Sequence, residues 1–195
     1  MTSALTAAFW LTLHAAALPA GITDLERQRL LAHLEMTERW LIDEVTGLTP
    51  AQQSARPAPA AWNILEVLDH LVLVGPLYWE DLQRALQTEP RDLNAADRDA
   101  SILWYGIDRS ERQQAIAGER IKGTVRDAET ALTAFRKNTA QLRHFIKTTN
   151  ADLRRHYVAR EACDAYQWAL LISTHVQRHI LQIREIKAAA GFPRR

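Results

Sequence analysis

The sequence predicts an all-α protein, a four-helix bundle of the up-down-down-up type with a long crossover between the second and third helices. Two observations predict this class. Four stretches of the chain place apolar residues three and four positions apart, which is the spacing of one face of an α-helix. In addition, only seven Gly and seven Pro interrupt the 195 residues, and no pair of strands stands out. Packing four such helices together buries their apolar faces.

The first helix is predicted to begin at Thr23 or Asp24, either of which can act as the N-cap, and to run to about Val45. Its apolar residues follow the helical spacing. Gly47 and Pro50 then end it, because glycine favours the C-terminal cap and proline does not continue a helix.

Residues 51–60 are predicted to form a loop, since prolines recur in this stretch. A second helix follows over about residues 61–87, with Pro76 inside it. Proline removes one backbone hydrogen bond and costs about 3 kcal/mol in a helix interior, so a kink or a short break is expected there.

Residues 89–123 lack helical periodicity and are too many for a plain connection, so they are predicted to form a crossover that contains a short helix. The third helix is predicted over about residues 125–148, and a connection follows over 149–162. Asp164 is a good N-cap for the fourth helix, which is predicted to end near Ala190.

The composition excludes several classes of function. Lys and Arg total 24 and Asp and Glu total 23, so the net charge of +1 offers no basic face to nucleic acid. The single cysteine, Cys163, excludes an internal disulfide and a multi-cysteine zinc module. No apolar run is long enough to predict a stable membrane span. The length suits one domain with a sizeable core.

The first residues differ from the rest of the chain. Residues 1–20 contain no Lys, Arg, Asp or Glu, and their Ala- and Leu-rich run ends in small residues. Residues 1–21 are therefore predicted to be a secretory signal peptide, which places the protein in the periplasm or outside the cell. The alternative is an extra N-terminal segment packed on the bundle of a cytoplasmic protein. Residues 22–195 form the four-helix domain in either case.

Three of the seven histidines have the pattern of metal ligands. His175 and His179 lie four residues apart in a helix, so both side chains leave the same apolar face. His70 lies on an inward face of the second helix, together with Trp62 and Glu66. One histidine from one helix and a pair from another supply three ligands to one ion inside a bundle. The alternative is that all three are buried histidines bonded to neighbouring side chains.

Three neutral imidazoles suit Zn²⁺, Ni²⁺, Fe²⁺ or Co²⁺ and leave coordination positions open for water or substrate. An open position lets the ion polarise an oxygen atom or deprotonate a bound water. Glu66, one turn before His70, is the candidate catalytic residue, as a base or as a group that orients a ligand; its alternative is a solvated charge. His33, His144 and His156 have no partner at ligand spacing and are expected at the surface or its boundary.

Two segments around the three candidate ligands resemble the DinB-like superfamily of DinB and YfiT-like proteins. Residues 62–71, WNILEVLDHL, are similar to its second-helix pattern Trp-Ser-x-x-Glu-x-x-x-His-Leu, with Asn63 in place of the usual Ser. Residues 175–183, HVQRHILQI, are similar to its fourth-helix pattern His-x-x-Arg-His-x-x-Gln-Ile. The Gly-Phe-Pro at 191–193 also recurs in members, and the resemblance covers about residues 24–193.

The resemblance implies a bacterial four-helix bundle with a long crossover and a divalent metal on His70, His175 and His179. The best-understood relatives are thiol S-transferases that use bacillithiol or mycothiol, and a mycothiol-dependent maleylpyruvate isomerase. By this resemblance the chain is a metal-dependent enzyme that activates a thiol or water, thiol S-transferase-like or hydrolase-like. The expected partners are a small-molecule substrate, such as a low-molecular-weight thiol, and a second copy of the chain in a homodimer. Export would separate the protein from a cytosolic thiol.

Two other functions remain open for the same fold. One is a non-catalytic protein that binds a metal or a small ligand. The other is a structural or dimerisation module in which the histidines are merely buried. A catalytic site keeps an exchangeable coordination position beside a cavity, a metal-holding protein closes that position with another side chain, and the module binds no metal.

Overall fold

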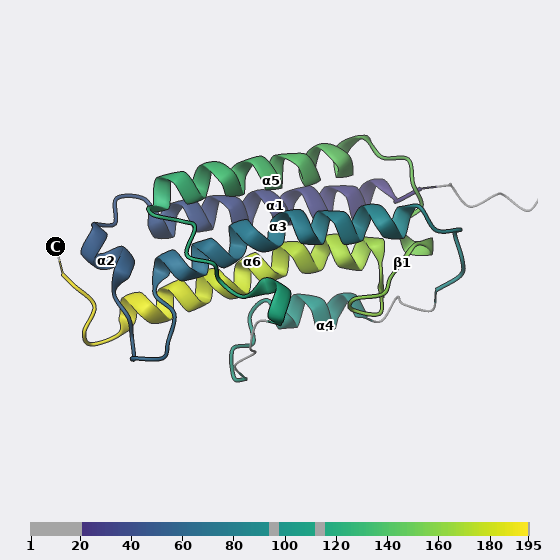
Figure 1. Ribbon diagram of the computed structural model, residues 1–195. Helices are drawn as coiled ribbons and strands as arrows, with labels where there is room; N and C mark the ends of the chain where they lie inside the picture. The colour runs from purple at the N-terminus through teal and green to yellow at the C-terminus, as the bar shows by residue number, and fades with distance from the viewer. Residues whose placement is uncertain (1–20, 94–97, 112–115, 195) are drawn as a thin grey trace, which may run out of the picture.

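The computed structural model describes residues 21–93, 98–111 and 116–194, and these are mostly helical (Figure 1). Four long helices lie side by side: α1 (Asp24–Val45), α3 (Ile64–Leu86), α5 (Ala128–Thr148) and α6 (Ala165–Ala188). Helices α1 and α3 each pack against both α5 and α6. The all-α class is confirmed, whereas the up-down-down-up order of the helices stays a prediction. The predicted signal peptide, residues 1–21, lies outside the described residues except for Gly21.

Side-chain caps explain where the long helices begin. Thr23, Asn63 and Asp164 each accept a hydrogen bond from the backbone N–H three residues further on. The side chain at that further position accepts one in return from the N–H of the cap residue. This reciprocal arrangement is a capping box, and it gives partners to two N–H groups that a helix start otherwise leaves unpaired. A cap typically contributes about 1 kcal/mol to the stability of the folded state. The predicted starts of the first and fourth helices are confirmed, while α3 begins at Ile64, later than Ala61.

The first four residues of the loop predicted over residues 51–60 are helical instead. They belong to a short helix, α2 (Pro50–Ser54), which packs against α3. Thr49 caps α2 in a capping box with Gln52, and Pro50 occupies the first helical position, where its missing N–H has no helical partner to lose. The prediction is wrong here because the proline that follows the end of one helix also starts the next.

The crossover between α3 and α5 contains the predicted short helix, α4 (Arg98–Tyr105), which packs against α6 (Figure 1). A single turn of 3-10 helix, η1 (Ala117–Glu119), follows it. From α6, the guanidinium of Arg178 donates hydrogen bonds to three backbone carbonyl oxygens of the crossover, those of Tyr105, Asp108 and Glu111. The side of α6 therefore holds the backbone of the crossover in place just after α4.

The connection before α6 holds two short strands that the sequence did not predict. Strand β1 (Tyr157–Val158) pairs antiparallel with β2 (Cys163–Asp164), with Tyr157 opposite Asp164. Two residues are too few to show the alternation by which a strand is recognised in a sequence. The pairing leads the chain directly into Asp164, the N-cap of α6.

Helix α3 continues through Pro76, so the short break that the prediction allowed does not occur. Proline at this position leaves the carbonyl oxygen of Val72 without its helical partner. The side-chain amide of Asn138 on α5 donates to this oxygen at 3.4 Å. The same amide lies against Gly75, where a Cβ atom would approach it to 2.6 Å. Glycine at position 75 therefore lets α5 supply the missing partner.

The apolar residues form two clusters between the long helices, and no helix within the described ranges is long and apolar enough to cross a membrane. One cluster gathers around Trp168 and the other around Ile180. Along α6, the buried members of the first cluster end at Leu170, and those of the second begin at Val176. His175 consequently lies where the two clusters meet.

Arg154, in the short 3-10 helix η2 (Leu153–Arg155), joins three parts of the fold. Its guanidinium pairs at 2.7–3.1 Å with carboxylates from α1, α4 and the cap of α6, those of Glu26, Asp99 and Asp164. Burial by itself would raise the pKa of Glu26 and of Asp99, but hydrogen bonds, including those from Arg154, hold both below their usual values. The ion pairs therefore stabilise the folded state at neutral pH.

We predict that Arg154→Ala lowers the free energy of unfolding by roughly 1–3 kcal/mol. Removing one partner of a fully buried ion pair costs about 3–5 kcal/mol, and the partial exposure of Arg154 reduces that figure. Urea denaturation at neutral pH measures the change, and Arg154→Lys is the control because it keeps the charge without the planar fork.

The difference between the wild type and Arg154→Ala should shrink as the pH falls below about 4. Carboxyls with a lowered pKa contribute stability above their unfolded pKa, and that contribution is lost as they become protonated. A difference of the same size at acidic and neutral pH would contradict the assignment of these ion pairs.

Candidate metal centre

His70 on α3 meets His175 and His179 of α6 between the two helices. The Nε2 atoms lie 3.3 Å apart from His70 to His175 and 3.1 Å apart from His175 to His179. The three residues are 2–9% exposed, and each offers a ligand atom within 4.8 Å of the others. Tetrahedral bonds of about 2.0–2.1 Å separate neighbouring nitrogen ligands by about 3.3 Å, so the two distances to His175 suit one ion. The predicted convergence of the three side chains is confirmed.

In two of these histidines, the Nδ1 atom is hydrogen-bonded to a carbonyl oxygen. His70 Nδ1 lies 2.8 Å from the backbone oxygen of Glu119, and His179 Nδ1 lies 2.8 Å from Oε1 of Gln182. A carbonyl oxygen can only accept a hydrogen bond, so each Nδ1 carries the proton. In a neutral ring the Nε2 atom then bears a lone pair, which is the form that binds a metal.

Burial keeps all three rings uncharged. It lowers the pKa of His70, lowers the pKa of His175 to about 3, and holds the pKa of His179 well below its usual value. The lone pairs of His70 and His179 therefore both face the ring of His175. A single proton on His175 cannot form a good hydrogen bond to both acceptors, whereas one divalent cation binds all three nitrogens. The donor set thus fits Zn²⁺, Ni²⁺, Fe²⁺ or Co²⁺.

Aromatic rings enclose the centre on two sides. The centroid of the Trp62 ring lies 5.3 Å from that of His70 and, in a stacked arrangement, 6.3 Å from that of His179. Tyr78, two turns beyond His70 on α3, has its ring centroid 5.5 Å from that of His175. These rings reduce contact with bulk water, and a drier site strengthens the electrostatic interactions within it.

A polar chain leads away from the centre at Tyr78. Burial, together with the neighbouring Glu119 carboxylate, raises the pKa of Tyr78, so its hydroxyl stays neutral. Glu119 pairs with Arg160 at 3.0 Å, and Arg160 also pairs with Asp81 of α3. Sequence reasoning missed Glu119 and Arg160 because both lie in connections without periodicity, where no spacing relates them to His70.

Glu66 lies one turn before His70 on α3, but its carboxylate turns back to the start of the helix. One oxygen accepts the backbone N–H of Asn63 at 2.9 Å, and both oxygens accept hydrogen bonds from Arg56. An effect of Glu66 on the centre would therefore pass through the first turn of α3. The signal for this orientation is present in the sequence, since a cap residue followed three positions later by Glu is a capping box.

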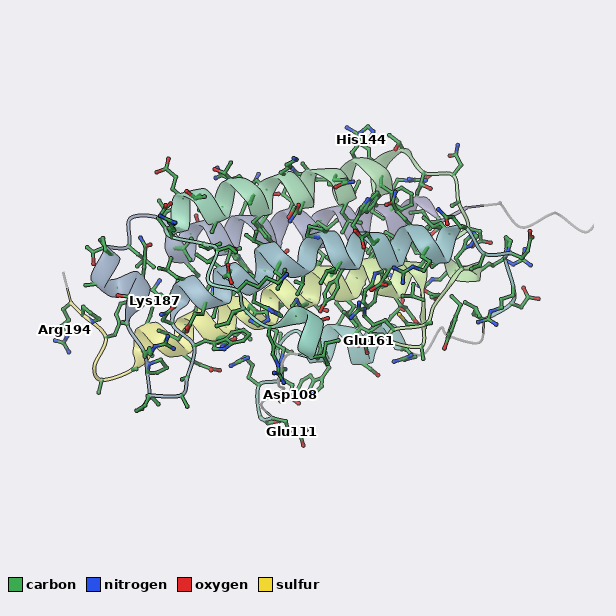
Figure 2. All side chains as sticks on the ribbon, viewed as in Figure 1. Asp108, Glu111, His144, Glu161, Lys187 and Arg194 are labelled. Atoms are coloured by element: carbon green, nitrogen blue, oxygen red, sulfur yellow. The ribbon has the colours of Figure 1, made fainter. Side chains whose placement is uncertain are left out.

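The other described histidines lie apart from this cluster. His144 is exposed, and Figure 2 shows it pointing outward from α5. His33 is half-buried, with Nδ1 2.7 Å from the hydroxyl oxygen of Ser173. The surface or boundary position expected for both is confirmed. The same expectation is wrong for His156, which is buried because its backbone oxygen accepts the N–H of Ala165 where β1 and β2 meet α6.

A small, mainly apolar cavity borders His175. It measures about 40 Å³ and is lined by residues of all four long helices. That volume holds a water molecule or a group about the size of a methyl. Pockets that enclose a drug-sized ligand measure about 300–1,000 Å³, so this cavity is much smaller than those pockets.

Comparison with known proteins confirms the resemblance seen in the sequence. The model of the DinB superfamily matches residues 24–183, a range that includes all three histidines. The chain is also 27% identical over 166 residues to the uncharacterized protein YuaE of Bacillus subtilis (strain 168), a match that covers 77% of this chain and 91% of YuaE. No solved structure matches the chain. Since the family model spans well over half of its length, the chain belongs to the DinB superfamily.

Proposed function

We propose that this chain is a divalent-metal-dependent enzyme with its ion on His70, His175 and His179. The observation that carries the proposal is that the Nε2 atoms of His70 and His179 lie 3.3 Å and 3.1 Å from that of His175, with ligand atoms of all three within 4.8 Å of one another. Three imidazoles suit Zn²⁺, Ni²⁺, Fe²⁺ or Co²⁺. Three protein ligands leave a coordination position for substrate, which is typical of catalytic sites and not of structural ones.

The proposed reaction activates a thiol or water, in thiol S-transferase-like or hydrolase-like chemistry on a small molecule. When bound, the ion would supply Lewis acidity, which lowers the pKa of a thiol or a water beside it. The chain supplies orientation, because the oxygens of Glu119 and Gln182 hold the rings of His70 and His179. The neutral hydroxyl of Tyr78 is hydrogen-bonded to the Glu119 carboxylate, and the Tyr78 ring contacts that of His175.

A non-catalytic protein that binds a metal or a small ligand is the second candidate. The observation that favours it is the burial of the three histidines, which are 2–9% exposed and covered in part by the ring of Trp62. Turnover requires substrate to reach the remaining coordination position, whereas holding a metal does not. A screen of thiol–electrophile pairs and of esters with the metal-loaded protein separates the two, since only the enzyme gives a rate.

The compartment and the assembly state bear on the substrate. Export of the protein would favour water or an external thiol as the group that is activated. A cytoplasmic protein would instead have access to low-molecular-weight thiols of the cytosol. A homodimer is the proposed assembly. Neither proposal changes the set of metal ligands.

We predict that His175→Ala abolishes stoichiometric metal binding and activity. The substitution removes one of three ligands, and the Nε2 atom of His175 is the one that lies within 3.3 Å of both others. Mass spectrometry of the metal content of untagged protein measures the loss. His144→Ala is the matched control, because His144 is exposed on α5 and should keep full occupancy. Full metal occupancy in His175→Ala would show that the ligand set is wrong.

Replacing Glu66 should affect turnover more than metal content. We predict that Glu66→Ala keeps its metal but reacts about 10-fold more slowly, because losing the capping box loosens the first turn of α3, which leads to His70. Glu66→Gln is the control, because Gln preserves the capping box while breaking the ion pair with Arg56. The test measures reaction rates on the substrate found in the screen, together with the metal content of each variant. A rate equal to that of the wild type in Glu66→Ala would leave Glu66 a surface charge.

The metal-free protein should lose stability as the pH falls from about 7 to about 5. The three buried histidines have a lowered pKa in the folded protein, whereas histidines in the unfolded chain have a pKa of about 6.5. Below that pH the unfolded chain takes up protons that the folded site excludes, so the free energy of unfolding declines. Denaturation in the presence of a chelator measures the decline, and zinc added at neutral pH should raise Tm. A stability that does not change over this range would contradict neutral, buried rings.

A further inference from the structure

The carboxylate of Asp69, the residue before His70, receives five hydrogen bonds from the crossover. Four come from consecutive backbone N–H groups and one from a hydroxyl, at 2.6–3.0 Å. The donors are the N–H groups of Lys122, Gly123, Thr124 and Val125, and the hydroxyl of Thr124. Asp69 is 2% exposed, so this carboxylate is hydrogen-bonded to the crossover in place of water.

The turn is shaped around that carboxylate. Gly123 has a φ of +66°, in the left-handed region, which lets successive N–H groups face one anion. Hydrogen bonds from N–H groups to an ionised carboxylate are stronger than those between neutral groups. Asp69 therefore fixes the position of residues 122–125 relative to α3.

The same stretch of crossover also contacts the metal centre. Three residues before the turn, the backbone oxygen of Glu119 accepts the Nδ1 proton of His70 at 2.8 Å. Asp69 and His70 are neighbours on α3 whose side chains leave the helix about 100° apart. Residues 119–125 are thus held from two directions, by one carboxylate and one imidazole.

We propose that Asp69 is a positioning residue of the metal centre: by clamping residues 122–125 it keeps the Glu119 oxygen on Nδ1 of His70. That oxygen fixes the ring as the Nδ1–H tautomer, so Nε2 faces His175 as a lone pair before any ion arrives. The proposal deepens the function proposed above and rests on the same three histidines. Its competitor is a purely structural clamp, which would stabilise the crossover without affecting the state of the ring.

Nitrogen-15 NMR of the metal-free protein tests the proposal, because it distinguishes the two tautomers of each histidine. In the wild type, His70 should be the Nδ1–H tautomer. In Asp69→Ala, the Nε2–H form of His70 should become populated, and the affinity for zinc should fall about 10–100-fold. The tautomer of His179 should not change, because Gln182 holds it from within α6.

The matched control is Asp127→Ala. Asp127 is also a carboxylate that accepts a backbone N–H, but it caps α5 and makes its bonds to Thr130. This variant should lose stability as helix caps do, while His70 keeps its tautomer and zinc affinity stays at the wild-type value. An unchanged tautomer and zinc affinity in folded Asp69→Ala would overturn the proposal and leave Asp69 a structural clamp.

If Asp69→Ala does not fold, Thr124→Val decides the question. It removes only the hydroxyl bond to Asp69 and leaves the backbone N–H donors in place. A smaller shift of His70 toward the Nε2–H form supports the proposal, and no shift overturns it. Failure of the proposed function gives a different result, since a wild type that binds no zinc still reports the His70 tautomer in each variant.

Discussion

Three uncharged imidazoles buried at one point are the constraint on which the rest of the structure depends. A buried polar group without a partner costs about 1–3 kcal/mol, and lone pairs that face one another add repulsion. Helices α3 and α6 bring the rings together, and two of the rings have an acceptor at the outer nitrogen: the oxygen of Glu119, from the crossover, for His70 and that of Gln182 for His179. The Nε2 atoms still face one another without enough protons to pair them all, so part of the free-energy cost of burying the rings remains. A cation bound there would remove it, and metal binding would then be linked to folding stability.

The crossover completes what the four long helices lack. Their inward faces are apolar clusters, which offer few hydrogen-bond partners to a buried ring. The chain between α3 and α5 brings a backbone oxygen and a carboxylate from Glu119, and the connection before α6 brings Arg160 to neutralise that carboxylate. Tyr78 then contacts both the charged pair and His175. The polar half of the site is thus assembled from irregular segments, while the histidine cluster is assembled from regular ones.

That division explains how much the sequence could predict. His175 and His179 were found because helical periodicity is local, and a spacing of four residues on an apolar face is visible in the chain itself. The orientation of Glu66 was also local information, carried by its capping box with the residue three positions before it. The role of Asp69 was not visible, because its partners lie 53–56 residues away and four of the five are backbone N–H groups that carry no sequence signal. Glu119 acts on the ring through a backbone oxygen, which no residue pattern identifies.

Helices α3 and α6, which carry the three histidines, hold the crossover by opposite chemistry at matching positions. Asp69, next to His70, accepts hydrogen bonds from backbone N–H groups of residues 122–125. Arg178, next to His179, donates to backbone oxygens that follow α4. An anion binds N–H groups and a cation binds carbonyl groups, so the two cannot exchange partners, and each of the two crossover segments has one register on its helix. Because each charged residue is the chain neighbour of a histidine of the cluster, a shift of the crossover would move one of these histidines with it. The backbone that Arg178 holds accounts for the Arg of the fourth-helix motif.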